Sequence, residues 1–154
     1  MNRKVGWLLT GVIVGIVAVG PWQTRSEAGT GKATIRINER VLAATRVEMS
    51  PPGVSPGDQE IIRARLLERG TGNTIGRSEL LCTFVDSGRS RSCRGTYILP
   101  KGKLVVGGSL LYRQFYELAV LGGTGLYDNA RGTVTVTRTS RKPVRDVVVI
   151  RLVG

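Results

Sequence analysis

The stretch LAVLGGTGLYDNARGTVTV, from Leu118 to Val136, decides the fold class of this chain. Two runs of strand-forming residues, 116–122 and 132–139, flank a segment rich in Gly, Asp and Asn, which is typical of a turn between strands. In the second run valines alternate with threonines, as in a strand with one buried face. Adjacent glycines allow the positive φ and close backbone approach of a sharp turn. No Gly-Lys-Ser/Thr follows, so a phosphate cradle is a weak interpretation.

The same pattern extends in both directions from this stretch. After residue 28 no segment has convincing helical periodicity, and short apolar runs alternate with Gly, Pro, Asn and Asp. Eight short strands in meander spacing indicate an all-β fold, an eight-stranded antiparallel up-and-down β-barrel, because closure leaves no exposed edge. The predicted strands are 33–37 or 41–48, then 59–68, 74–85, 91–99, 103–112, 116–122, 132–139 and 145–152.

Several of these strands are apolar on both faces, notably 145–152. A barrel wall that is apolar on its outside as well as its inside predicts a covered outer face, such as an oligomer interface. We therefore expect a homo-oligomer, a dimer or a trimer.

The first 28 residues are typical of a targeting segment. A short basic start, Met1–Lys4, precedes an almost wholly apolar run, and small residues at Ser26 and Ala28 suit cleavage after Ala28. The apolar run is also just long enough to span a bilayer as an uncleaved anchor. The predicted organisation is thus 1–28 as signal peptide or membrane anchor and 29–154 as the barrel, secreted or anchored outside the cytoplasm.

Composition excludes several kinds of chemistry. The chain has 154 residues, no histidine and two cysteines, which rules out Ser-His-Asp catalysis and His-ligated or four-thiolate zinc sites. We expect no metal and no cofactor. The formal net charge of +12 suits contact with anionic lipid or an anionic envelope polymer, or it is simply a solvated basic face. Basic residues do not interleave with aromatic ones, so no nucleic-acid partner is expected.

The two cysteines predict a strand register. If Ser87-Gly88 is the two-residue turn of a hairpin, directly opposed residues have numbers that sum to 175, as those of Cys82 and Cys93 do. Opposed side chains lie near disulfide range, and an exported compartment is oxidising. A catalytic cysteine is the rival interpretation, but no base is visible to activate it.

The stretch that opens this section resembles the signature of the allene oxide cyclase and dirigent proteins. The matching residues are Val120, Gly122, Gly123, Thr124, Gly125, Ala130, Arg131 and Gly132, with Gly76, Cys82, Thr96, Tyr97, Gly102, Leu104, Val105 and Gly107 upstream. The resemblance covers about residues 60–140. Asn38-Glu39-Arg40 is similar to the cyclases' ligand-contact segment, and no role is assigned to it.

This resemblance implies an eight-stranded barrel, often trimeric, with a hydrophobic ligand inside. It implies a cofactor-free cyclase or isomerase that folds a reactive hydrophobic molecule, such as a polyketide or other secondary-metabolite intermediate, and controls its ring closure and stereochemistry. Two alternatives stay open: a dirigent-like binding protein that only orients substrates, and an envelope barrel whose basic outside binds anionic polymer.

Candidate site residues follow from the motif and from side-chain chemistry. Arg131 could bind a carboxylate or polarise a carbonyl, or simply pair with Asp128 at the rim. An acid or base role is possible for any carboxylate that points into an apolar lumen. Tyrosines could orient a substrate carbonyl or merely pack. The catalytic candidates are Arg131, Asp128, Glu117, Glu48 and Glu60, and the substrate-binding candidates are Tyr97, Tyr112, Tyr116, Tyr127 and Phe84.

Overall fold

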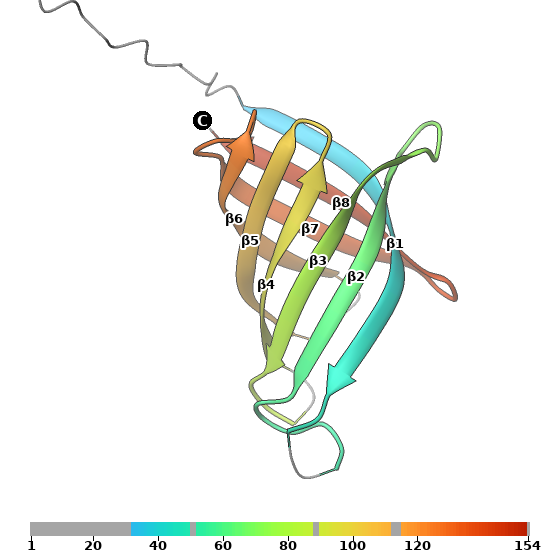
Figure 1. Cartoon of the computed structure of the whole chain (residues 1–154), viewed down its shortest axis with the longest axis vertical. Coiled ribbons are helices and arrows are strands. Elements are labelled where there is room, and N and C mark those ends of the chain that lie inside the picture. Colours follow the sequence, from blue (N-terminus) through green and yellow to red (C-terminus); the bar gives the residue numbers. More distant parts are fainter. Residues whose placement is uncertain (1–31, 50–51, 88–89, 112–114, 154) are drawn as a thin grey trace, which may run out of the picture.

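The computed structural model describes residues 32–49, 52–87, 90–111 and 115–153. They form a closed barrel in which each strand pairs antiparallel with the next and β8 pairs with β1 (Figure 1). The strands are β1 (Ala33–Val47), β2 (Gln59–Glu68), β3 (Thr74–Phe84), β4 (Ser90–Leu99), β5 (Gly102–Leu111), β6 (Phe115–Gly125), β7 (Arg131–Arg141) and β8 (Val144–Val153).

Seven of the eight strands lie where the sequence predicts them, within three residues at each end. The exception is the first, because 33–37 and 41–48 are parts of a single 15-residue strand, β1. Its pairing with β2 shifts register between Val41 and Ala43, which leaves Leu42 as a bulge. A bulge bends a strand and resets its alternation. The alternation of side chains is consequently interrupted within β1, and the sequence pattern therefore predicts two alternative short strands instead of one long strand.

Alternation along the strands separates a lumen from an outer wall. On β3 the inward row contains Ser78, Leu80, Cys82 and Phe84, all buried, while the outward Arg77 and Glu79 are exposed. The lumen side chains are mainly apolar and form one core cluster, and an eight-stranded barrel is wide enough for packed side chains or for one small ligand. The buried cluster contains Ile37, Leu66, Leu80, Cys82, Cys93, Tyr97, Leu99, Leu104, Val106, Leu110, Leu118, Val120, Val134, Val136, Val148 and Ile150.

The β3–β4 hairpin has the predicted register. Cys82 pairs with Cys93, and the two form a disulfide across the ladder. All pairs from Arg77↔Ile98 to Phe84↔Arg91 follow the same sum of 175. Part of the proposed Ser87-Gly88 turn lies outside the described residues. A disulfide is compatible with the expected extracytoplasmic location.

The predicted targeting segment, 1–28, lies outside the described residues. Within the ranges that the structure covers, no helix has the length and apolarity needed to cross a bilayer.

The glycine motif ends β6 in a tight approach to the following turn. A Cβ on Gly123 would lie 2.2 Å from the carbonyl oxygen of Tyr127, and Gly125 has φ of +66°. Any side chain at the first position would collide with backbone, and an L-residue at the second would be strained. The motif therefore acts structurally, closing the β6–β7 connection at the barrel rim.

Candidate functional site

A polar cluster lies within the apolar lumen. Glu39 on β1 is 3% exposed and accepts a hydrogen bond from the hydroxyl of Ser78 on β3, although β2 separates the two strands. The register explains the contact, because Ala64 of β2 pairs with Ser78 and Gly76 lies beside it on the inward row. These small residues leave room for the glutamate side chain to pass across β2. The result is a carboxyl group held inside the barrel.

Burial makes Glu39 a proton carrier near neutral pH. The pKa of Glu39 is raised from 4.5 to about 7, and loss of hydration is the largest cause. The hydrogen bond from Ser78 lowers this pKa, and the negative charge of Asp146 raises it. The positive charge of Arg138 lowers the same pKa by a smaller amount. A group with this pKa can hold or release a proton under physiological conditions.

An ion pair lies on the other side of Glu39. Asp146 of β8 pairs in register with Glu39 and is 3% exposed. It accepts two hydrogen bonds from Arg138 of β7, one from Nε at 2.9 Å and one from Nη2 at 3.3 Å. The two-point contact fixes the orientation of the aspartate. Glu39 thus lies between a hydroxyl donor and a fixed negative charge.

Two tyrosines complete the cluster. Tyr97 of β4 is completely buried, pairs in register with Ser78, and its hydroxyl has no hydrogen-bond partner among the described residues. Burial raises the pKa of Tyr97 well above its usual value, and the charges of Glu39 and Tyr116 raise it further. Tyr116 of β6 is half-buried, and burial also raises its pKa. Both hydroxyls are therefore neutral hydrogen-bond donors at any physiological pH.

A second polar group lies in the lumen toward the β3–β4 turn. Arg91 forms an ion pair with Glu60, whose side chain is 15% exposed. The guanidinium groups of Arg91 and Arg46 lie 6.0 Å and 5.4 Å from the centre of the Phe84 ring. This end of the lumen is consequently both aromatic and cationic.

The structure brings four of the predicted site residues into the lumen: Tyr97, Tyr116, Phe84 and Glu60. Others lie at the rim or on the outer wall. Arg131 is exposed and donates hydrogen bonds to the carbonyls of Leu121 and Ala130, and Glu117 accepts one from Thr135. Asp128 and Glu48 are exposed, Tyr127 packs at the rim, and Tyr112 lies outside the described residues. The roles of all these residues stay predictions.

Sequence reasoning did not select Glu39, Ser78, Arg138 or Asp146. The alternation along the strands could have indicated two of them. Glu39 lies on the same inward row as Ile37, and Asp146 lies on the same inward row as Val148 and Ile150. Charged residues within strands are usually solvent-facing, and that expectation hid the cluster.

Within the described part of the chain, no group of three or more metal-ligating side chains occurs. The lumen cluster instead offers hydrogen-bond donors, one proton-carrying carboxyl group and fixed charges in apolar surroundings.

Comparisons with known proteins agree with the geometry. Neither a family model nor a curated protein sequence matches the chain. Solved structures do match. A pyocyanin demethylase is 21% identical, with a TM-score of 0.69 over 78% of this chain and 99% of that chain. The Diels-Alderase AbmU from Streptomyces koyangensis is 20% identical, with a TM-score of 0.64 over 79% and 64%. A pterocarpan synthase dirigent protein is 14% identical, with a TM-score of 0.59 over 79% and 93%.

These structural matches confirm the predicted resemblance at the level of the fold. The chain has the allene oxide cyclase and dirigent-like eight-stranded β-barrel fold.

Proposed function

We propose that this barrel is a cofactor-independent cyclase that binds a reactive hydrophobic molecule in its lumen and directs its ring closure. The observation that carries the proposal is the completely buried, unpartnered hydroxyl of Tyr97 beside the buried Glu39. A buried polar group without a partner is costly, so its persistence points to a ligand atom that satisfies it.

The surrounding groups suit a substrate that carries a carbonyl. The Tyr97 hydroxyl donates a hydrogen bond to the carbonyl oxygen, and Tyr116 is a second neutral donor nearby. A hydrogen bond that strengthens as negative charge develops on that oxygen lowers the barrier. Apolar walls restrict the chain to a conformer in which the reacting carbons approach. Glu39 holds a proton for substrates whose cyclisation requires one.

Support for this chemistry also comes from the structural neighbours. The Diels-Alderase AbmU is named for a cycloaddition, and the dirigent protein for pterocarpan synthesis. The pyocyanin demethylase is named for a different reaction. The fold therefore supports several reactions, and the lumen residues of this chain determine which of them it performs. We propose export as the setting, since the disulfide favours an oxidising compartment.

The test uses the protein as cells produce it and a panel of linear polyenes that bear an activated alkene next to a carbonyl. No oxidant and no cofactor are added, and chiral chromatography measures the rate and the stereoisomer ratio of the cyclised product. We expect acceleration and one dominant stereoisomer. Replacing Tyr97 by Phe removes only the hydroxyl and should lower the rate about tenfold, which is about 1.4 kcal/mol of barrier.

The Tyr97→Phe variant should fold normally, because the hydroxyl it lacks has no partner among the described residues. Tyr127→Phe is the matched comparison: this tyrosine lies in the β6–β7 turn, so we expect full activity, and a loss would instead support its candidate role in binding the substrate. If the barrel changes only the stereoisomer ratio, and only after a separate oxidase generates the reactive species, the dirigent-like alternative replaces the cyclase. Equal rates for Tyr97→Phe and the unmodified protein would refute the role of the hydroxyl.

A further inference from the structure

Four arginines form a row across the outer wall. Arg145 of β8 pairs in register with Arg40 of β1, Arg40 pairs with Arg65 of β2, and Arg65 pairs with Arg77 of β3. All four are exposed. Neighbouring strands lie about 4.8 Å apart, so the four backbone positions span about 14 Å around the barrel. We call this set the arginine row.

Such a row is unfavourable in the isolated protein. Like charges that lie directly opposite on neighbouring strands repel one another. Within the described residues, Arg40, Arg65 and Arg145 have no salt bridge with a carboxylate. Arg77 contacts Glu79 through Nε at 3.1 Å, but both side chains are more than half exposed and the pair contributes little. An anionic partner would remove this repulsion.

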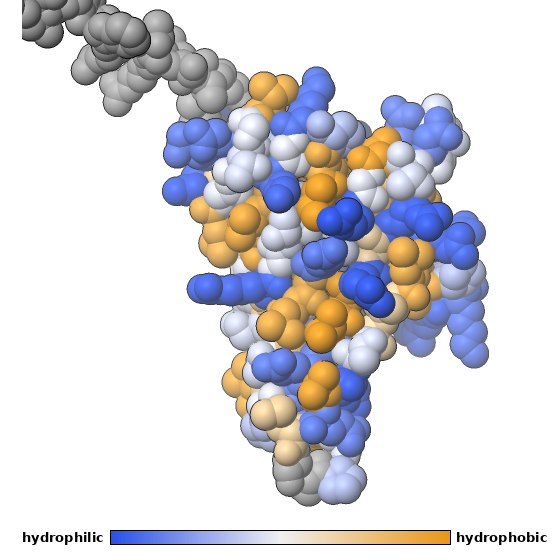
Figure 2. Space-filling view, viewed as in Figure 1, coloured by the Kyte–Doolittle hydropathy of each residue, from blue (hydrophilic) through white to orange (hydrophobic). Residues whose placement is uncertain are grey.

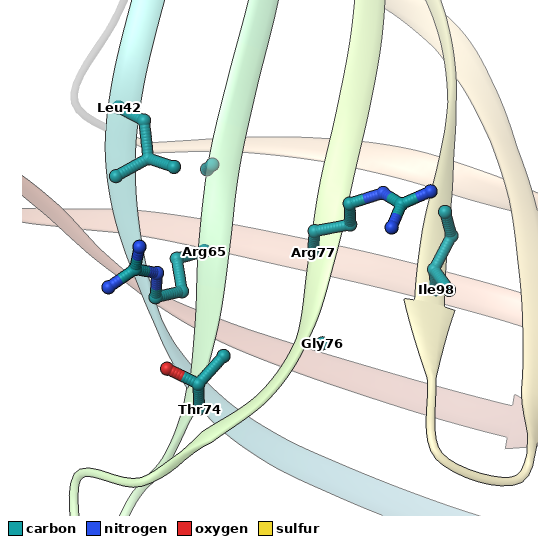
Figure 3. A pocket seen from close by; sticks show the side chains of 7 residues that line it. Leu42, Arg65, Thr74, Gly76, Arg77 and Ile98 are labelled. Carbon is teal, nitrogen blue, oxygen red and sulfur yellow. The ribbon is translucent and has the colours of Figure 1, made fainter.

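Two hollows of the outer wall divide the row into pairs. Arg65 and Arg77 line a hollow of about 400 Å³ together with Leu42, Thr74 and Ile98. Figure 3 shows Arg65 extending toward β1 and Arg77 toward β4, so that they point away from each other and leave the floor between them open. A second hollow, of about 360 Å³, lies beside Arg40 and Arg145, and its lining also includes the lumen carboxyl groups of Glu39 and Asp146.

We propose that the arginine row binds a linear phosphate-bearing polymer, whose successive phosphates contact successive arginines of the row. Guanidinium groups bind phosphate oxygens in two-point contacts, and four of them in line match a chain of repeated anions. The centres of the two pairs lie two strand spacings apart, about 10 Å. A polymer that reaches both hollows gains both contacts at the cost of one association.

The shape of the wall favours a flexible chain over a flat membrane. The row follows the circumference of a closed barrel, so a chain can bend along all four arginines while a bilayer would touch only part of the curve (Figure 1). Figure 2 shows hydrophilic side chains scattered among hydrophobic ones on the face it presents, rather than one continuous apolar surface. The residues that line the two hollows include no aromatic side chain, so bases of a nucleic acid would have no stacking platform there.

The test measures binding of long-chain polyphosphate to the protein as cells produce it, by fluorescence anisotropy at several salt concentrations. Four neutralised arginines predict a log–log salt slope of about −3 and an affinity about 50-fold weaker at 200 mM than at 50 mM salt. The variant R40Q/R65Q/R77Q/R145Q should lose the steep slope. The matched control is R36Q/R94Q/K101Q/R151Q, which removes the same charge at exposed positions outside the row and should keep both slope and affinity.

Three further probes separate the possible sources of binding. Orthophosphate should bind far more weakly than the polymer, because a single phosphate can contact only part of the row. Oligothymidylate and anionic lipid vesicles should also bind more weakly than polyphosphate. Equal loss of affinity in the two quadruple variants would show that only total charge matters and would overturn the proposal. Preference for vesicles or for oligothymidylate over polyphosphate would overturn it as well.

Discussion

The arginines inside the barrel and those on its outer wall differ in how their charge is compensated. Inside the barrel, Arg138 and Arg91 each contact a carboxylate, Asp146 and Glu60. On the outside, the arginine row places like charges opposite one another across three strand pairs. A buried charge must be compensated within the fold because water is absent, whereas an exposed charge is solvated and needs no partner inside the protein. The two lumen arginines are thus paired with carboxylates inside the fold, whereas Arg40, Arg65 and Arg145 of the row have no such pair among the described residues.

The largest effect should come from breaking the lumen ion pair. Asp146 is almost fully buried, while the Arg138 side chain is 31% exposed. Replacing Asp146 by Asn leaves a partly buried guanidinium without its carboxylate, and we expect a loss of about 3 kcal/mol in the free energy of unfolding, at the lower end for such pairs because of solvent screening. Urea denaturation of the variant measures this loss.

A double variant sharpens this result. R138M/D146L replaces both charges by apolar side chains and should recover most of the lost stability, because the cost lies in the unpaired charge and not in the absence of the pair. If the double variant is as unstable as D146N, packing at these positions and not charge compensation explains the effect. Charge compensation would then not distinguish the lumen from the outer wall.

The second effect concerns pH and the buried carboxyl group. Because burial raises the pKa of Glu39 from 4.5 to about 7, the folded protein holds this proton more tightly than the unfolded chain. The stabilisation is complete below pH 4.5 and is lost as the pH rises through 7, which amounts to about 3 kcal/mol. Urea denaturation from pH 4 to pH 8 should show this decline in the unmodified protein.

The difference from Glu39→Gln isolates the group. A glutamine does not titrate, so the variant should lack the part of the decline that falls between pH 4.5 and 7. Parallel pH curves for the two proteins would mean that Glu39 is ionised and well compensated in the lumen.

Most of the fold could be predicted because each strand has its own local signal. Alternation placed β7 correctly, short apolar runs placed β2 and β3, and the paired cysteines gave the register of the β3–β4 hairpin. The exception was β1, where the bulge at Leu42 breaks the period of two. Bulges depend on how a strand bends to meet two neighbours, which the strand's own residues do not encode.

The site was harder to predict because it depends on contacts between distant strands. Tyr97, Phe84 and Glu60 were selected for their chemistry and do lie in the lumen. Glu39 was named within a segment similar to the cyclases' ligand-contact segment but was given no role. Its burial requires a passage across β2, which depends on small residues of two other strands that come into register. Arg131 was selected from its motif, and the structure places it at the rim with its hydrogen bonds on backbone carbonyls.

The smallest effect should come from relieving repulsion on the outer wall. Arg65 lies directly opposite both Arg40 and Arg77, so Arg65→Gln should stabilise the fold by about 0.3 kcal/mol at low salt. The gain should fade as salt screens the charges. Arg94 is the control, because it lies opposite Leu81 and Gly107 and its replacement by Gln relieves no direct pair. If Arg65→Gln destabilises the protein instead, the hydrocarbon stem of Arg65 must gain more from packing in its hollow than its charge costs. Packing of the arginine stems would then offset the charge repulsion on the outer wall, and no anionic partner would be needed to explain the arginine row.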